Sequence, residues 1–208
     1  MKKYSFMLIG VCVLVFILQM MFPFIEDNFA LYSSRVVEEP WMLLSSMFLH
    51  GGFQHLFFNM FALGLFGFIL ESIIGSRRFI TIYLVSGLIA SIGAAIFYPA
   101  SLGASGAIYG ILGALAVLRP RMRVWVWMIP MPMYMAAIMW AVLDLLGMFA
   151  PSGVANAAHL FGLGTGVLAG LYLKGDFRLP RRSSDPLKRK DRMKIERYFD
   201  NLEERHRS

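Results

Sequence analysis

The chain has 208 residues, 58% hydrophobic and 16% charged, whereas a soluble domain is about half apolar and about a quarter charged, so the composition indicates a membrane protein. The net charge of +7 is uneven: from Lys174 onward lie 12 of the 20 basic and 7 of the 13 acidic residues. The rest carries only +2 (8 minus 6), which favours a cytoplasmic membrane face over nucleic acid as the partner of the tail.

Six apolar runs follow in chain order, each long enough or nearly long enough to cross a bilayer about 30 Å thick, which takes about 20 helical residues. The first is too long for a signal peptide and has no cleavage site after it. We expect an all-α membrane protein with a six-transmembrane-helix bundle in residues 1–174 and a charged cytoplasmic tail in residues 175–208. The runs are Tyr4–Ile25, Phe53–Ile74, Phe79–Tyr98, Gly103–Leu118, Met133–Phe149 and Val154–Leu173.

The connecting loops alternate in charge. Basic residues join the second run to the third and the fourth to the fifth, whereas acidic residues outweigh Arg35 in the first loop. Since basic loops stay in the cytoplasm, both termini are expected there, in a bacterial inner membrane, and runs two, four and six point the same way. The basic residues are Arg77, Arg78, Arg119, Arg121 and Arg123, and the acidic ones are Glu26, Asp27, Glu38 and Glu39.

Three segments lie outside the runs. The long outer loop between the first two runs, residues 26–52, carries apolar side chains such as Trp41 that suit the membrane surface. The stretch Arg123–Pro132 is expected to be an interfacial lead into the fifth run, because its prolines disturb a straight helix. From Asp185 and Pro186 onward, the tail is open between a short charged helix and a solvated segment.

Polar residues inside apolar runs are costly in lipid and are commonly functional. Here they are chiefly His55, Asn59, Ser105, Asp144 and His159. At ~1.5 Å per helical residue from the cytoplasmic end of each run, Ser105 stands ~21 Å high, His159 ~22 Å and Asn59 ~24 Å, with His55 one turn higher. Polar residues on three parallel helices therefore share the outer part of the membrane.

Small residues predict close contact between the fourth and sixth runs. Each run repeats a small residue at every fourth position, which gives the helix one smooth face. Where the two faces meet, Ser105 and His159 lie at similar depth on adjacent helices. The two sets are Gly106, Gly110 and Ala114 in one run, and Gly162, Gly166 and Gly170 in the other.

Together these side chains supply the parts for acyl transfer. A serine nucleophile needs a general base within hydrogen-bond reach, and His159 suits that role for Ser105. Ser105 also lies at the start of its helix, where unpaired N–H groups favour a developing anion. His55 and Asn59, four residues apart, share one helix face and can both donate hydrogen bonds to an oxyanion.

Other interpretations stand beside this one. Ser105 also suits ordinary helix packing, and Tyr109 suits either core packing or stacking on His159. Asp144 either orients the histidine or pairs with loop groups or water, and Cys12 is best explained as a buried, inert thiol. A three-histidine metal site is disfavoured, because the chain has no HExxH stretch and no nearby carboxylate, so we expect no metal and no cofactor. Those histidines are His50, His55 and His159.

Four stretches match the motifs of one known family: GASG around Ser105 with Tyr109 one turn on, AHLFGLGTG at 158–166, HGGFQHLFFNM at 50–60, and Glu71 followed by GSRRFITIYLVSG at 75–87. Over about residues 36–173 the chain resembles the rhomboid family of intramembrane serine proteases. The resemblance covers most of the apolar part of the chain, and the combination of motifs is more specific than GxSG alone.

The resemblance implies a catalytic dyad, with Ser105 as nucleophile and His159 as general base and acid, and no acidic third member. It implies oxyanion donors from His55, Asn59 and the backbone N–H of Ser105. Gly103 matches the glycine that stands two residues before the family's serine. Asp144 lies outside the family's motifs.

The resemblance also implies single-span membrane proteins as substrates, cut near the outer face of the membrane. Because a helix hides its carbonyl groups, helix-breaking residues are expected near the cut. The fifth run, with its bulky Trp140, is the expected lateral gate. Trp41-Met42 stands where the family usually has Trp-Arg. A non-catalytic relative that binds transmembrane helices and a small transporter are the rival functions; the first typically loses the serine or histidine, and the second needs a midplane site.

Overall fold

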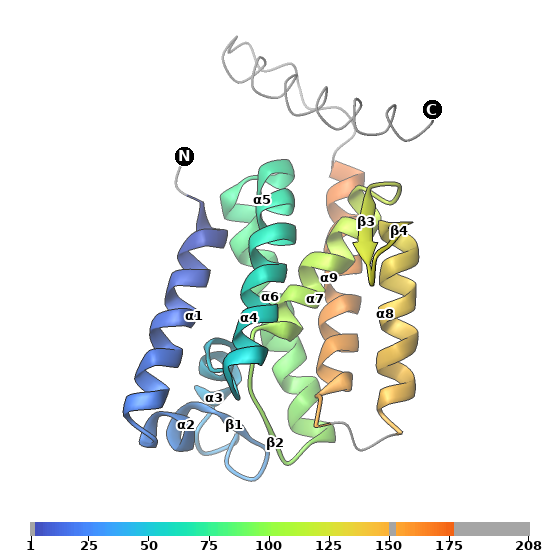
Figure 1. Cartoon of the computed structure of the whole chain (residues 1–208). Coiled ribbons are helices and arrows are strands. Elements are labelled where there is room, and N and C mark those ends of the chain that lie inside the picture. Colours follow the sequence, from blue (N-terminus) through green and yellow to red (C-terminus); the bar gives the residue numbers. More distant parts are fainter. Residues whose placement is uncertain (1–2, 150–152, 177–208) are drawn as a thin grey trace. The chain divides into compact units, whose positions relative to one another are not determined.

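The computed structural model describes residues 3–149 and 153–176, which are mostly α-helical (Figure 1). The long helices are α1 (Tyr4–Met21), α6 (Ser76–Phe97), α7 (Ser105–Leu118), α8 (Met133–Gly147) and α9 (Asn156–Asp176). Another long helix is continuous through α4 (Phe53–Ala62), the π-helical turn η2 (Leu63–Gly67) and α5 (Phe68–Ile74). The short elements are α2 (Phe24–Phe29), β1 (Leu31–Tyr32), α3 (Met42–Ser45), the 3₁₀ turn η1 (Ser46–Phe48), β2 (Ala100–Ser101), β3 (Arg123–Val126) and β4 (Ile129–Pro132).

Within the described residues, three helices are long and apolar enough to cross a membrane: Tyr4–Met21, Phe53–Ile74 and Ser76–Phe97. Helices α7 and α8 are also apolar but shorter. These helices confirm the expectation of a helical membrane protein, while the number of six crossings stays a prediction. The predicted charged tail lies outside the described residues, apart from residues 175 and 176.

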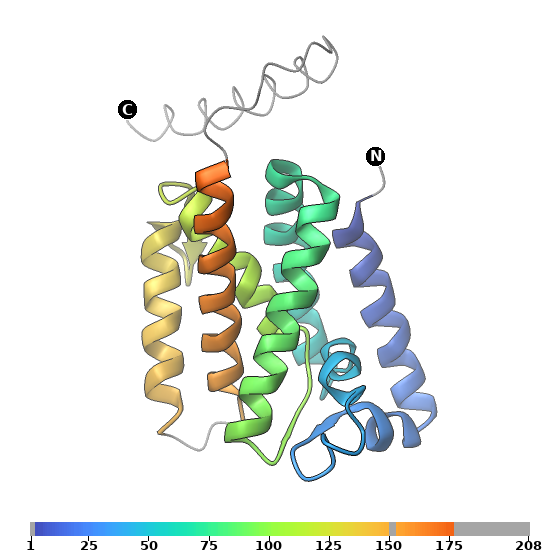
Figure 2. The same ribbon diagram turned by 180° about the vertical axis from the view of Figure 1, so that it is seen from behind.

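Charged residues separate between the two ends of the helices. Within residues 3–174, the start of α1, the turn between α5 and α6 and the β3–β4 pair lie at one end, and α2, α3, β1 and β2 lie at the other (Figures 1 and 2). Lys3 precedes α1, Arg77 and Arg78 lie in the first turn of α6, and Arg119 follows α7, so basic residues gather at the first end. The acidic residues of the first loop belong to the other end.

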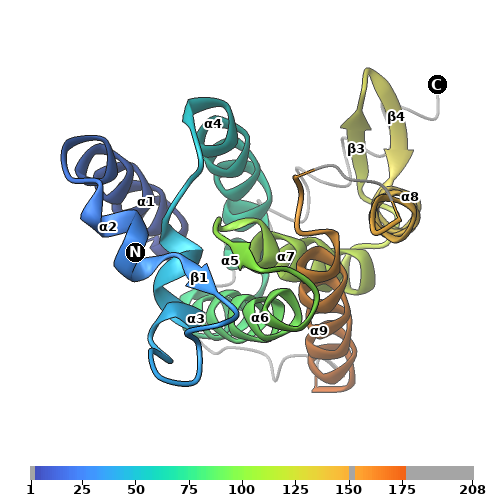
Figure 3. The ribbon, with the colours of Figure 1, turned by 90° about the horizontal axis from the view of Figure 1, so that it is seen from below.

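Helix α7 lies between α4, α6 and α9, as the view along the helices shows (Figure 3). Its glycines bring the backbones into contact: a methyl group on Gly162 of α9 would overlap the carbonyl oxygen of Gly106, and one on Gly166 would overlap that of Gly110. On its other side, a methyl group on Gly106 would overlap the side chain of Ala90 in α6. The predicted contact between the small-residue faces of α7 and α9 is therefore confirmed.

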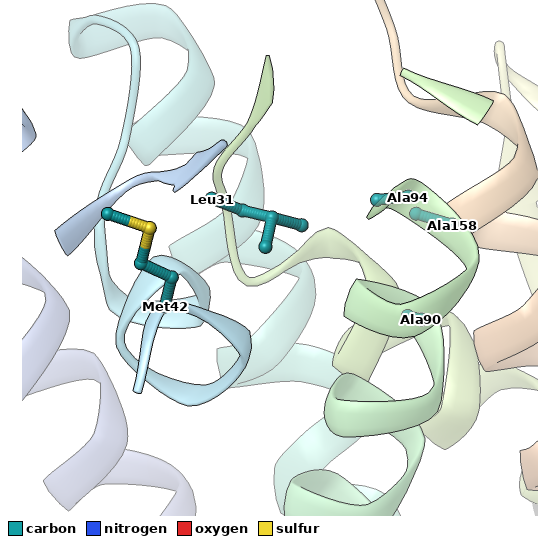
Figure 4. Close-up of a cluster of buried hydrophobic side chains, with 5 residues drawn as sticks. All are labelled: Leu31, Met42, Ala90, Ala94 and Ala158. Atoms are coloured by element: carbon teal, nitrogen blue, oxygen red, sulfur yellow. The ribbon is translucent and has the colours of Figure 1, made fainter. Parts of the chain in front are cut away.

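The segment between α1 and α4 packs against the helices through buried apolar side chains. Met42, which stands where the family usually has arginine, is fully buried beside Leu31. The side chain of Leu31 points toward α6 and α9, where Ala90, Ala94 and Ala158 complete the cluster, and Met42 lies on the other side of Leu31 from these alanines (Figure 4). Burial of a methionine side chain contributes about 1.5–3 kcal/mol, so Met42 is a strong apolar anchor for this segment.

The stretch that leads into α8 is a β-hairpin. Strand β3 pairs antiparallel with β4, with Val126 opposite Ile129. The two residues of its turn, Trp127 and Met128, have φ angles of 49° and 66°, a conformation that side chains other than those of glycine and asparagine rarely adopt. Hairpin turns of this kind usually carry Asn-Gly or Asp-Gly, so the sequence had no turn signal here and the hairpin was not predicted.

Candidate active site

The start of α7, and with it the position of Ser105, is set by the residues just before it. Gly103 has a φ of 126°, and a methyl group there would lie 2.7 Å from the ring of His55, so both backbone and space require glycine. The N–H of Gly103 donates to the carbonyl oxygen of Ser46 at 2.9 Å, and β1 pairs with β2 just upstream. Because the first N–H groups of a helix have no intrahelical partner, that of Ser105 can bind an anion.

Ser105, His159 and Asp144 form a continuous chain of hydrogen bonds. The Oγ of Ser105 lies 2.8 Å from Nε2 of His159, and Oδ1 of Asp144 lies 2.9 Å from Nδ1 of the same ring. The histidine is 9% exposed and the aspartate 5%. The ring of Tyr109 stacks on the imidazole, with 4.2 Å between centroids and 14° between planes. Three helices, α7, α8 and α9, thus bring one residue each to this chain.

One tautomer of His159 satisfies both contacts of this chain. A carboxylate only accepts hydrogen bonds, so the contact with Asp144 fits the tautomer that has its N–H at Nδ1. Its Nε2 then has a lone pair for the hydroxyl of Ser105. The stacked ring of Tyr109 limits rotation of the imidazole. A serine, a histidine oriented in this way and an aspartate can together perform nucleophilic acyl transfer.

His55 and Asn59 extend from α4 toward the same place. The N–H of Gly51 lies 3.4 Å from Nδ1 of His55, which leaves Nε2 as the protonated, donating nitrogen. The Nδ2 of Asn59 donates to the carbonyl oxygen of His55 at 2.8 Å and retains a second hydrogen. Each side chain therefore has a donor available for a bound anion.

A cavity of about 1090 Å³ joins these four residues. His55, Asn59, Ser105 and His159 all line it, together with residues 98–102 and the facing ends of α8 and α9. Ligand cavities are commonly about 300–1,000 Å³, so this one is large enough for an extended stretch of peptide. The predicted residues thus share one cavity. Of the predicted supports, Gly103 lies against His55 and Ser105, and Tyr109 stacks on His159.

His50 lies beside this site with its ring unsatisfied. It is 1% exposed, its two ring nitrogens have no hydrogen-bond partner within the described part of the chain, and its ring stands edge-on to His55 at 5.2 Å. Burial first, and then the neighbouring His55, lower the pKa of His50 from 6.5 to about 4. Over residues 3–149 and 153–176, no three His, Cys, Asp or Glu side chains are grouped as metal ligands.

Sequence patterns missed two polar contacts that hold the surroundings in place. The amide of Gln19 in α1 accepts from the N–H of His50 at 3.0 Å and donates to its carbonyl oxygen at 3.4 Å. The carboxylate of Glu71, noted only as a motif residue, accepts from the N–H groups of Tyr4 and Ser5 at 2.9 and 3.0 Å and so caps α1. A polar residue within an apolar run was the available signal for both.

Comparison with known proteins shows the family of the chain. The Rhomboid domain family model matches residues 37–175. The chain is 39% identical over 144 residues to Rhomboid protease GluP of Bacillus subtilis, a match that covers 69% of this chain and 27% of the relative. It is 37% identical over 138 residues to RHOMBOID-like protein 4 of Arabidopsis thaliana, a match that covers 65% of this chain and 34% of the relative. It is 30% identical over 190 residues to the mitochondrial Rhomboid protein 1 of Saccharomyces cerevisiae, a match that covers 83% of this chain and 54% of the relative.

The fold and the site define a helical integral membrane protein with a hydrogen-bonded serine and histidine beside a cavity. The chain belongs to the rhomboid family, which confirms the resemblance drawn from its motifs. It spans only about a quarter to about half of the length of the three relatives named above. Since those relatives come from a bacterium, a plant and a mitochondrion, the bacterial inner membrane stays a prediction.

Proposed function

We propose that the chain is an intramembrane serine endopeptidase that cuts transmembrane segments of single-span membrane proteins near the outer face of the membrane. The observation that supports this best is the 2.8 Å contact between Oγ of Ser105 and Nε2 of His159, beside a cavity of peptide size. Family membership adds support, because a relative 39% identical to this chain is named as a rhomboid protease.

In this mechanism the hydroxyl of Ser105 passes its proton to Nε2 of His159 while Oγ attacks the scissile carbonyl carbon. The resulting oxyanion accepts hydrogen bonds from the N–H of Ser105, from His55 Nε2 and from Asn59 Nδ2. His159 then gives the proton to the leaving amine, and the peptide bond breaks to leave an ester on Ser105. Water, activated by the same histidine, hydrolyses the ester and restores the serine.

The membrane topology that fits this function has six crossings with both termini in the cytoplasm. Basic residues lie at the end of the helices where α1 begins, and that end is the cytoplasmic one by the positive-inside rule. Helix α7 has 14 residues and is therefore ~21 Å long, which puts Ser105 well below the outer surface of a ~30 Å hydrocarbon core. The cavity supplies the water that hydrolysis needs at this depth.

Substrate segments reach the cavity from the lipid, between α4 and α8. The end of α8 lines the cavity through Gly147 and Met148, and Phe58 of α4 lines it on the other side. The rings of Phe66, in the turn η2 that continues α4, and of Trp140 in α8 meet edge-to-face, with centroids 6.3 Å apart. Outward movement of α8 would separate these rings and admit a helix, which must then unwind to expose its carbonyl groups.

A cleavage assay in liposomes with a model transmembrane substrate tests the proposal. Wild type is expected to cut, whereas Ser105→Ala and His159→Ala should each lose at least about 1,000-fold in kcat/KM, because a serine without its base is a weak nucleophile. Ser72→Ala is the matched control, since Ser72 lies near the start of α1, where its hydroxyl accepts from Lys3.

A fluorophosphonate probe provides a second measurement that needs no substrate. It should label wild type and Ser72→Ala equally and leave Ser105→Ala unlabelled. Cleavage retained by Ser105→Ala, or activity abolished by a chelator, would contradict the serine mechanism. A folded wild type that neither cuts nor labels would favour the non-catalytic, helix-binding relative instead.

A further inference from the structure

Asp144 is a buried carboxylate in an apolar helix. It lies in the last turn of α8, is 5% exposed, and accepts from Nδ1 of His159 at 2.9 Å. Its other oxygen, Oδ2, has no hydrogen-bond partner among the described residues. The hydroxyl of Tyr109, whose ring stacks on His159, is a further polar neighbour of the carboxylate. The contacts of Asp144 thus point to the histidine rather than to its own helix.

Stabilisation of α8 does not explain this residue. A negative charge near the C-terminal end of a helix is disfavoured by the helix dipole. A carboxylate within a membrane helix is also costly, unless it is paired or hydrogen-bonded. Both effects oppose Asp144 at this position, and the hydrogen bond to His159 is the contact that offsets them.

The contact controls what His159 can do. With the ring N–H directed at Asp144, the lone pair of Nε2 is directed at Ser105, which is the state that a general base needs. Without an acceptor at Nδ1, the ring can also place its proton on Nε2 and donate to the serine, which blocks catalysis. When the ring accepts the serine proton, the carboxylate stabilises the new charge, more strongly inside the protein than in water.

We propose that Asp144 is a positioning residue that fixes the proton of His159 at Nδ1, so that this chain uses a serine, a histidine and an aspartate where its family implies a dyad. The proposal rests on the proposed protease function. It adds that the third residue, Asp144, comes from α8. This is the helix that lines the cavity and that moves outward to admit substrate. When α8 packs against α9, the Asp144 carboxylate orients His159 as the general base. When α8 moves outward, His159 loses this hydrogen-bond acceptor.

Two substitutions at this position separate a positioning role from a structural one. Asp144→Asn keeps the shape of the side chain, and Asp144→Leu replaces the polar group with an apolar side chain at this buried position. Leu145→Ala is the matched control, because Leu145 follows on the same helix and is 52% exposed. We expect both Asp144 variants to lose roughly 10- to 100-fold in kcat with KM within about twofold. This is less than the ~10⁴-fold effect of Asp→Asn in a soluble triad, because the family operates as a dyad.

Nitrogen-15 NMR of histidine-labelled protein gives a readout that does not depend on activity. In wild type the signal of His159, assigned by its loss in His159→Ala, should show a protonated Nδ1. Asp144→Leu should shift the ring toward protonated Nε2 while its thermal stability equals or exceeds that of wild type, and Leu145→Ala should change neither.

Three results would overturn the proposal: unchanged kcat in both Asp144 variants, a loss of kcat with the wild-type tautomer retained, or a changed tautomer with unchanged kcat. If wild type itself neither cuts nor reacts with fluorophosphonate, the protease function fails. The NMR comparison would then still show whether Asp144 sets the tautomer.

Discussion

Helices α7 and α8 both contribute to the site, yet they are packed in opposite ways. Nine of the 14 residues of α7 are buried, against four of the 15 residues of α8. The glycines of α7 place its backbone directly against α6 and α9, whereas α8 exposes large apolar side chains such as Ile138 and Leu146. Ser105, the proposed nucleophile, therefore stands on the more enclosed of these two helices, and Asp144 stands on the more exposed one.

The difference shows how a membrane protein can combine precision with access. Ser105 and His159 must keep a 2.8 Å contact, and backbone-to-backbone packing leaves little room for either helix to shift. In the proposed protease, substrate must also enter from lipid, which requires at least one helix with weak lateral contacts. Tight packing of α7 with α9 and loose packing of α8 meet these two demands separately.

The largest effect is expected where the tight contact is broken. Gly166→Val would push a side chain into the carbonyl oxygen of Gly110, so we expect a loss of about 3 kcal/mol or more in stability and a loss of fluorophosphonate labelling of at least about 100-fold. Gly164→Val is the control on the same helix, because nothing lies within 4 Å of a methyl group there. If Gly166→Val and Gly164→Val behave equally in unfolding and labelling assays, tight packing of α7 against α9 does not hold the site in place.

A pH-dependent effect of intermediate size is expected on the enclosed side. The pKa of His50 is about 4 in the folded protein and 6.5 in the unfolded chain, so between these values the unfolded state binds more protons. Stability should therefore fall as the pH drops from 6.5 to 4, by on the order of 3 kcal/mol. His50→Gln should flatten this slope in thermal unfolding measured across that range. A variant with the wild-type slope would exclude His50 as its source.

The smallest effect is expected from holding α8 still. A short bismaleimide that joins Phe66→Cys to Trp140→Cys should slow cleavage of a transmembrane substrate about tenfold and leave fluorophosphonate labelling unchanged, because a small probe needs no lateral opening. Cys12 is fully buried and should not compete for the reagent. Each single variant treated with the same reagent is the control. Full cleavage by the joined protein would show that α8 need not move.

Most of the fold could be predicted from the sequence, because a lipid environment requires apolar helices of a certain length and favours small residues where helices touch. Apolar length located α1, α4 to α6 and α7, and small residues at every fourth position predicted the contact of α7 with α9. Helix rise alone placed Ser105 and His159 at the same depth. These properties depend on spacing along the chain, which a sequence displays directly.

The rest depends on side-chain direction or on local strain, which spacing does not reveal. Asp144 was visible as a polar residue in an apolar run, but its partner follows from the rotation of α8 about its axis. The β3–β4 hairpin was missed because its turn uses Trp127 and Met128 at positive φ instead of a glycine. The role of Gln19 was not predicted, because a single polar residue in a long apolar run is often tolerated without a function. Its partner, His50, also lies 31 residues away in a loop.

The length of α7 has one more consequence for the proposed protease. The helix extends from Ser105 to Leu118, immediately before Arg119, so in the proposed topology the depth of the proposed nucleophile is counted from the cytoplasmic surface. One inserted residue would rotate the serine by about 100° away from His159, and the next insertion that restores its direction would move it by about one turn, ~5.4 Å. The length of α7 thus sets the depth of Ser105 in steps of about one helical turn. The proposed cleavage then occurs at a fixed height above the inner surface, independent of bilayer thickness.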